Sequence, residues 1–193
     1  MESKFDKEDI DEAIEVLKAG GVILYPTDTI WGLGCDATNP EAVEKIYAIK
    51  KRPDSKSLIS LVADADMLGR YVKVIPEVAI NLIEVNDRPM TIIYPGAMGL
   101  APNAIAEDGT AGIRIPSGSP FCTELLRRFH KAIISTSANV SGEPSPTCYE
   151  EIPIGIIESA DWVADPCLGE DEGTGEASQI IKVGLRGEIE VLR

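Results

Sequence analysis

The chain has 193 residues, enough for one domain that buries roughly 70% of the surface its unfolded form would expose. Its 32 acidic and 18 basic residues give a formal net charge of −14. That balance excludes broad, non-specific attraction to nucleic acid, because such attraction depends on neutralising phosphates with Lys and Arg. Any RNA contact is therefore expected to be weak and local.

The cysteines, the N-terminus and the apolar runs exclude further classes of protein. The four cysteines form no C-x-x-C pair and no metal-ligand spacing with the single histidine, so we expect reduced thiols and no protein-built metal site. The N-terminus is charged from its second residue and lacks an apolar signal region. No run approaches the ~20 apolar residues of a membrane helix. We therefore expect a cytoplasmic protein with no membrane partner.

Helical and strand patterns are mixed along the chain without strict βα alternation. Helical patterns cover residues 10–17, 40–49, 65–71, 76–85 and 120–129. Strand patterns cover residues 22–25, 58–62, 90–94, 111–115, 132–136, 162–163, 179–183 and 188–192, and the short stretch 31–37 is left unassigned. This order predicts a single domain, residues 1–193, of the α/β class, with a twisted mixed sheet flanked by helices.

The segment from Gly21 to Lys56 carries the clearest local signal for a ligand site. Its first strand delivers residues 26–29 to the strand end, where open α/β sheets bind their ligands. A cluster of five basic residues follows: Lys45, Lys50, Lys51, Arg52 and Lys56. Against an acidic background this cluster suits a phosphate-bearing ligand, since Arg grips phosphate bidentately and Lys acts as a point charge. The alternative is an ordinary solvated helix end that Pro53 terminates.

Hydroxyl and amide side chains gather around the end of the strand at 132–136. Side chains of this kind can cradle phosphate oxygens, although Ser-rich segments also form ordinary turns. They are Ser135, Thr136, Ser137 and Asn139, with Ser141 and Ser145 close behind. A nucleotide would have to be held by such groups, because the sequence has no P-loop and its G-x-G-x-x-A match at 32–37 precedes the helix start instead of opening the helix.

Single residues near these segments allow several interpretations. Asp28 can be a general base, a metal ligand or, most commonly for Asp beside Thr, an Asx-turn residue. Tyr25 and Trp31 are expected in the core or in a pocket wall. His130 is expected at a helix end with no chemical role.

Five separated motifs occur in a fixed order and together carry a resemblance to a known family. They are PTDTIWGLG at 26–34, KKRP at 50–53, TAGIRIP at 110–116, STSANVSGEPSPT at 135–147 and ASQI at 177–180. With these motifs the chain resembles the YrdC/Sua5 family, in its short single-domain form. The resemblance implies a YrdC/RibB-like fold.

The resemblance also implies an activity. Family members act as nucleotidyltransferases that make L-threonylcarbamoyladenylate from L-threonine, bicarbonate and ATP, with release of pyrophosphate. The product supplies t6A modification of tRNA through downstream tRNA t6A-transfer proteins, and Mg²⁺ would arrive with ATP. Two alternatives are an RNA-binding YrdC-like protein without adenylation activity and a relative that forms carbamoyl-adenylate.

Residue roles follow from the same motifs. The resemblance implies threonine contacts for Thr29, Arg114, Ser135 and Ser178, and a catalytic role for Lys50 and Arg52 beside the nucleotide phosphates. It implies ATP contacts for Arg52, Lys56, Thr110, Ser137, Asn139, Ser145 and Arg193. Two positions depart from the family pattern: Leu61 stands where several archaeal relatives place a threonine-contacting His, and Trp31 replaces the usual Tyr.

Overall fold

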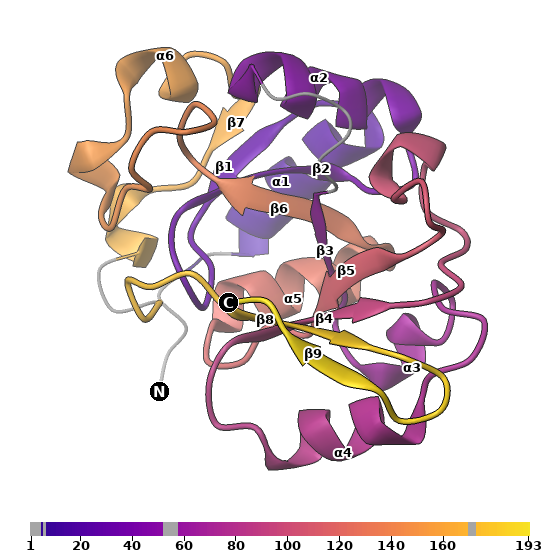
Figure 1. Cartoon of the computed structure of the whole chain (residues 1–193). Coiled ribbons are helices and arrows are strands. Elements are labelled where there is room, and N and C mark those ends of the chain that lie inside the picture. Colours follow the sequence, from indigo (N-terminus) through magenta and orange to yellow (C-terminus); the bar gives the residue numbers. More distant parts are fainter. Residues whose placement is uncertain (1–4, 6, 52–57, 170–172) are drawn as a thin grey trace.

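A computed structural model describes residues 5, 7–51, 58–169 and 173–193. Its described strands form one mixed sheet of nine strands in the order β7-β1-β2-β6-β3-β5-β4-β8-β9 (Figure 1). Three neighbouring pairs, β1/β7, β3/β5 and β4/β8, are parallel and the other pairs are antiparallel. The prediction of a mixed α/β sheet is confirmed. The strands are β1 Ile23–Tyr25, β2 Gly32–Asp36, β3 Ile59–Leu61, β4 Met90–Tyr94, β5 Ala111–Arg114, β6 Ile133–Ser137, β7 Trp162–Val163, β8 Gln179–Val183 and β9 Ile189–Val191.

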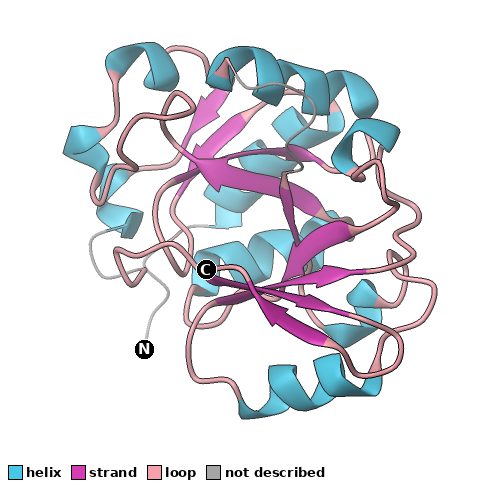
Figure 2. Ribbon diagram, in the orientation of Figure 1, coloured by secondary structure: helices cyan, strands magenta, loops and turns pink. Residues whose placement is uncertain are grey.

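Helices surround this sheet (Figure 2). The α-helices are α1 Lys7–Lys18, α2 Pro40–Lys50, α3 Ala65–Leu68, α4 Glu77–Val85, α5 Pro120–Phe129 and α6 Ile154–Ile157, and the short 3₁₀ helices are η1 Pro102–Ala104, η2 Tyr149–Glu151 and η3 Pro166–Gly169. The apolar spacing predicted for the first helix is met, because α1 buries Ile10, Ala13, Ile14 and Leu17. Helices α1 and α5 pack against each other, and Phe121 of α5 stacks on Trp162 of β7.

The ends of helix α2 explain where the basic cluster begins. Asn39 caps the helix by accepting hydrogen bonds from the Glu41 and Ala42 N–H groups, as its place before Pro40 predicts. The helix ends at Lys50, and Lys51 adopts a left-handed conformation with φ 49°. We expected Pro53 to stop the helix. The left-handed residue stops it earlier, and Pro53 lies outside the described residues.

Strand β2, in the stretch that the sequence left unassigned, packs closely on its neighbours through glycine. A Cβ on Gly34 would lie 2.7 Å from Tyr25 Cε1 and 2.9 Å from the Ile134 carbonyl oxygen. The buried ring of Tyr25 therefore occupies the space that a side chain at Gly34 would need.

Gly34→Ala is expected to lower the free energy of unfolding by about 2 kcal/mol, because overpacking a tight core forces neighbours to shift. Urea denaturation measures this loss. Gly155→Ala is the matched control, since a Cβ at Gly155 in α6 meets nothing within 4 Å, and it should leave stability unchanged or slightly higher. Equal stability of the Gly34→Ala variant and the wild type would contradict the packing argument.

Candidate functional site

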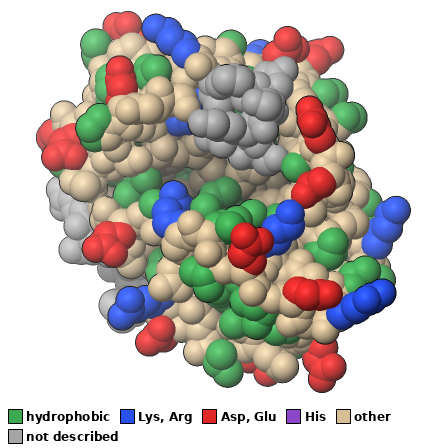
Figure 3. All heavy atoms as spheres, viewed as in Figure 1, with side chains coloured by type: hydrophobic (Ala, Val, Ile, Leu, Met, Phe, Trp, Pro, Cys, Tyr) green, Lys and Arg blue, Asp and Glu red, His purple; other side chains and the backbone are tan. Residues whose placement is uncertain are grey.

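One cavity of about 220 Å³ opens where the ends of β1, β5 and β6 meet the segment before β8. Figure 3 shows a hollow near the middle of the corresponding face, with hydrophobic and basic side chains around it. It is lined by Thr27, Thr29, Ile30, Trp31, Gly32, Leu58, Ile59, Arg114, Ser135, Thr136, Ser137, Ser145, Ala177, Ser178, Ile180 and Arg193. Residues from four of the five motifs therefore meet at one place.

The cavity brings together seven of the residues that the resemblance assigns to substrates. All four expected threonine contacts line it, and so do three expected ATP contacts, Ser137, Ser145 and Arg193. Lys50, Thr110 and Asn139 are described but do not line it. Arg52 and Lys56 lie outside the described residues, so their roles remain predictions.

Arg114 forms a charged floor to the cavity at the end of β5. One guanidinium nitrogen donates to Thr29 Oγ1 at 3.0 Å, and the other lies 3.2 Å from Asp28 Oδ1. Asp28 is 2% exposed and Arg114 is 5% exposed, so water screens this ion pair little. The guanidinium is thereby held in a fixed orientation, which suits recognition of a carboxylate.

Asp28 holds Arg114 without itself lining the cavity. Its Oδ2 accepts the Ser117 N–H at 3.1 Å while its Oδ1 faces the guanidinium. Burial raises the pKa of Asp28 above its ordinary value, and Arg114 and the Ser117 N–H act in the opposite direction. The commonest interpretation, an Asx-turn residue, is therefore wrong: Asp28 is a buried partner of Arg114, which lies 86 positions further along the sequence.

The Thr29 hydroxyl has a defined polarity. Thr27 Oγ1 donates to the Ile30 carbonyl at 2.8 Å, so it has no proton left for Thr29, whose oxygen is 2.9 Å away. Thr29 must therefore donate its proton to Thr27 while it accepts from Arg114. The remaining capacity of the Thr29 hydroxyl is that of an acceptor only.

Residues 173–175 are fastened to the segment that carries these groups. The Thr174 N–H donates to the Asp28 carbonyl at 3.2 Å, and the Gly175 N–H donates to the Thr29 carbonyl at 2.9 Å. At Gly173 φ is +86°, and a Cβ there would lie 2.6 Å from the Thr29 carbonyl oxygen. Glycine is required at this position because only it combines that conformation with so close an approach.

Lys50 supports the loop after β6 from within the protein. Its ammonium donates to the Ser137 and Asn139 carbonyls at 2.6 and 2.7 Å and to Asn139 Oδ1 at 3.0 Å, and the residue is 2% exposed. Asn139 Oδ1 also accepts from Ser137 Oγ at 2.6 Å, and its amide donates to the Glu143 carbonyl at 2.6 Å. Lys50 and Asn139 together therefore fix the position of Ser137 at the cavity wall.

The three described residues of the basic cluster, Lys45, Lys50 and Lys51, do not converge on one place. The Lys50 ammonium is directed to protein acceptors, which differs from the expected phosphate contact, and Lys45 donates to the Gly20 carbonyl at 2.7 Å. Lys51 is exposed.

The opposite side of the cavity is held by Arg193 and Ser178. The Arg193 guanidinium donates twice to the Ser178 carbonyl, at 3.0 and 2.9 Å, and Ser178 Oγ is 2.8 Å from Thr91 Oγ1.

Thr110, an expected ATP contact, bonds to a carboxylate of the protein. Its hydroxyl donates to Asp108 at 2.6 Å, and Lys182 binds the same carboxylate. These contacts hold the pKa of Asp108 at about 2, with the Thr110 hydroxyl the largest contribution.

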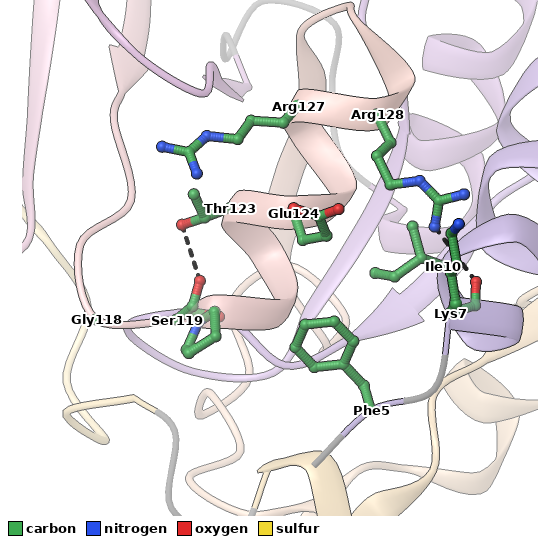
Figure 4. Close-up of a pocket in the computed structure, with 10 residues that line it drawn as sticks. Phe5, Lys7, Ile10, Gly118, Ser119, Thr123, Glu124, Arg127 and Arg128 are labelled. Atoms are coloured by element: carbon green, nitrogen blue, oxygen red, sulfur yellow. Dashed lines mark hydrogen bonds between the residues drawn. The ribbon is translucent and has the colours of Figure 1, made fainter. Parts of the chain in front are cut away.

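A separate hollow of about 670 Å³ lies between the N-terminal segment and α5 (Figure 4). Phe5 and Ile10 contribute apolar walls, and Arg128 donates to the Lys7 carbonyl and pairs with Asp11. Arg127 points away from Arg128 in this view. No expected site residue lines this hollow, so the cavity beside Arg114 is the candidate site.

Known proteins resemble this chain over most of its length. The model of the Sua5/YciO/YrdC family, described as "Telomere recombination", matches residues 15–193. The chain belongs to the YrdC/Sua5 family. It is 33% identical over 174 residues to a threonylcarbamoyl-AMP synthase of Stenotrophomonas maltophilia, covering 89% of this chain and 91% of that protein.

Two solved structures share the YrdC/Sua5 fold. Sua5 of P. abyssi in complex with L-threonine aligns with a TM-score of 0.87 and 26% identity, covering 98% of this chain and 55% of that chain. YciO of E. coli aligns with a TM-score of 0.79 and 26% identity, covering 97% of this chain and 89% of that chain. The present chain therefore spans about half the length of the P. abyssi protein.

The two departures from the YrdC/Sua5 pattern differ in their consequences. Leu61 is fully buried, pairs in register with Arg114 and does not line the cavity. Trp31 does line it and packs edge-on against Tyr149, with ring centroids 5.2 Å apart. The side chain at position 61 is therefore part of the core beside Arg114, whereas Trp31 shapes the cavity wall.

Two kinds of feature are absent from the part of the chain that the structure describes. No helix within the described ranges is long and apolar enough to cross a membrane. Across the same residues, no group of three or more His, Cys, Asp or Glu side chains could hold a metal ion.

Proposed function

We propose that this chain is a threonylcarbamoyl-AMP synthase, an ATP-dependent nucleotidyltransferase that uses L-threonine and bicarbonate. The observation that carries the proposal is the buried Arg114–Thr29 contact at the floor of a cavity whose other wall holds Ser137, Ser145 and Arg193. A carboxylate-binding floor beside polar groups suited to phosphates fits an amino acid placed against a nucleotide. The family membership and the 33% identity to a synthase support it.

The threonine half of the cavity would orient the amino acid through its charged groups. The Arg114 guanidinium would bind the α-carboxylate, since Asp28 already fixes its orientation. Thr29 Oγ1 would accept a hydrogen bond from a donor of the substrate. Ser135 and Ser178, from β6 and the segment before β8, would complete the pocket.

The nucleotide half would hold phosphates near the loop after β6. Ser137 and Ser145 supply hydroxyl groups and Arg193 supplies a cation at the cavity wall. Arg52 and Lys56, in the family's K-x-R motif and after it, are proposed to contact ATP as well. Mg²⁺ would enter with ATP and be bound mainly by phosphate oxygens, in keeping with its preference for few protein ligands.

The reaction would need positioning and charge stabilisation and no covalent enzyme intermediate. The threonine amine would add to the bicarbonate carbon with loss of water, giving an N-carboxylate. An oxygen of that carboxylate would attack the α-phosphorus, the bond to the bridging oxygen would break, and pyrophosphate would leave. Holding two anions in contact lowers the barrier through proximity and fixed cationic groups. The product would pass to tRNA t6A-transfer proteins.

The deciding experiment measures pyrophosphate release from ATP with threonine and bicarbonate omitted in turn. Release that depends on both substrates supports the proposal. Release with carbamoyl phosphate in place of both would indicate a carbamoyl-adenylate-forming enzyme. No release under any of these conditions, together with salt-resistant binding of duplex RNA, would indicate the RNA-binding alternative.

Thr29→Val is expected to raise KM for L-threonine about tenfold, ~1.4 kcal/mol, because the isosteric side chain cannot accept from the substrate. Pyrophosphate release is measured as a function of threonine concentration. Thr147→Val is the matched control, since the Thr147 hydroxyl bonds to Glu151 at the surface and does not line the cavity. An unchanged KM in the Thr29 variant would remove this hydroxyl from the substrate contacts.

A further inference from the structure

A second hollow lies on the sheet face opposite the cavity. Its volume is about 380 Å³, and no residue lines both hollows. It is lined by Ile113, whose side chain points away from that of its neighbour Arg114 because adjacent strand residues face opposite sides. Ile92 of β4 pairs in register with Ile113. Met90 and Tyr94, two positions to either side of Ile92, lie on the same face of the sheet. The two hollows are therefore separate sites on the two faces of the sheet.

The strands and helices around the second hollow line it with mostly apolar side chains, and Tyr94 adds a phenolic hydroxyl group. Leu68 and Ile83 face the strands from α3 and α4. Tyr94 is 2% exposed, and its hydroxyl has no hydrogen-bond partner among the described residues. Burial raises the pKa of Tyr94, so the hydroxyl keeps its proton at neutral pH and is a donor. The hydroxyl can therefore donate to an acceptor placed in the hollow.

The mouth of the hollow presents one negative and one positive charge side by side. Asp87 and Arg88 follow each other in the loop after α4, are exposed and line the hollow. Neither forms an ion pair with another described residue. Asn86 donates its side-chain amide to the Arg88 carbonyl, which fixes the shape of this loop.

We propose that this second hollow binds a free aromatic α-amino acid. The ligand carboxylate would meet Arg88, the ammonium would meet Asp87, and the ring would lie among Met90, Ile92 and Ile113. A phenolic oxygen at the far end of the ring would accept from Tyr94. The volume lies within the range of small-molecule sites, roughly 300–1,000 Å³, and apolar walls with a few polar groups are their usual lining.

The proposal is tested by calorimetric titration of the full chain with L-tyrosine and L-phenylalanine. Saturable binding is expected for both, tighter for L-tyrosine, at concentrations up to a few mM, which corresponds to roughly −4 kcal/mol. Phenethylamine lacks the carboxylate, 3-phenylpropionate lacks the ammonium and L-alanine lacks the ring. Each of these three probes should bind at least about tenfold more weakly.

Variants then locate the bound amino acid. Arg88→Ala is expected to weaken L-phenylalanine binding about tenfold, while Arg186→Ala, which removes an exposed cation that does not line the hollow, leaves it unchanged. Tyr94→Phe should weaken L-tyrosine more than L-phenylalanine. The absence of saturable binding, meaning a hollow that holds only water, would overturn the proposal. So would binding that survives Arg88→Ala, or binding that L-threonine displaces, which would place the ligand beside Arg114. None of these outcomes depends on whether the chain makes threonylcarbamoyl-AMP.

Discussion

Asp28→Asn is expected to lower kcat/KM for L-threonine about a hundredfold, ~2.7 kcal/mol of transition-state stabilisation. The carboxylate faces Arg114 at 3.2 Å and accepts the Ser117 N–H at 3.1 Å, so it orients the guanidinium without lining the cavity. Asparagine keeps the size of the side chain. If its oxygen stays on Ser117, its NH₂ group faces the guanidinium, and two donors cannot bond to each other.

The loss should come mainly from a higher KM for threonine, because Arg114 would no longer be held where the α-carboxylate binds. Steady-state pyrophosphate release measures the two constants separately. Asp161→Asn is the matched control, since Asp161 accepts a backbone N–H from Val22 outside the cavity. A lower kcat with an unchanged KM would indicate that Asp28 moves a proton in the reaction, contrary to a positioning role. Thermal unfolding of each variant is followed in parallel because breaking a buried pair can itself destabilise the protein.

The same pair should give the wild type a distinct dependence on pH. Burial raises the pKa of Asp28, so this carboxylate gains its proton at a higher pH than an ordinary Asp. Threonine affinity should fall as the pH falls through that raised pKa, because the protonated group no longer holds Arg114 by charge. Asp28→Asn should lack this acidic limb.

The second large effect is expected from Lys50→Met, which should lower the free energy of unfolding by about 3 kcal/mol. The substitution keeps much of the apolar stem but removes three donated hydrogen bonds, and it leaves the Ser137 and Asn139 carbonyls buried without this partner. Urea denaturation measures the loss. Lys51→Met is the control, because it makes the same change at the adjacent, exposed residue.

Activity of the Lys50 variant separates two roles for this residue. If Lys50 positions the loop, the variant should show a higher KM for ATP together with lower stability, since Ser137 at the cavity wall would lose its support. If Lys50 contacts phosphate, as the sequence motif predicts, kcat should fall while the free energy of unfolding stays close to that of the wild type. The second pattern would refute the positioning role.

Much of the fold could be predicted from local patterns, and the exceptions have physical causes. Helix α2 could be located because Asn39 and Pro40 mark its start in the sequence itself. Strand β2 could not be located, because Gly32 and Gly34 lack the side chains that give a strand its alternating pattern. Glycine is needed at these two positions because Ser135 packs closely on Gly32 and Tyr25 packs closely on Gly34.

In the candidate site, too, local motifs predicted some features and the fold alone determines the others. Motifs predicted roles for Thr29, Arg114 and Ser178, and the structure brings these three residues to one cavity. The contacts among them were beyond prediction: Arg114 reaches Thr29 across 85 positions, and Lys50 reaches Asn139 across 89. A sequence reveals that a Lys or Asp is present, but its burial and the partner that neutralises it are determined by the sheet order.

The polarity of the Thr29 hydroxyl has a consequence for inhibitor chemistry. Since its proton is committed to Thr27, the atom of any molecule that sits opposite this oxygen must itself carry a hydrogen. The oxygen or sulfur atom of an ether, ester or thioether would be repelled by the Thr29 oxygen, whereas an amine, an N–H amide or an alcohol could donate a hydrogen bond to it. A competitive compound built on the amino acid should therefore retain an N–H or O–H at that corner, and replacing that hydrogen with a methyl group is the simplest way to abolish its fit.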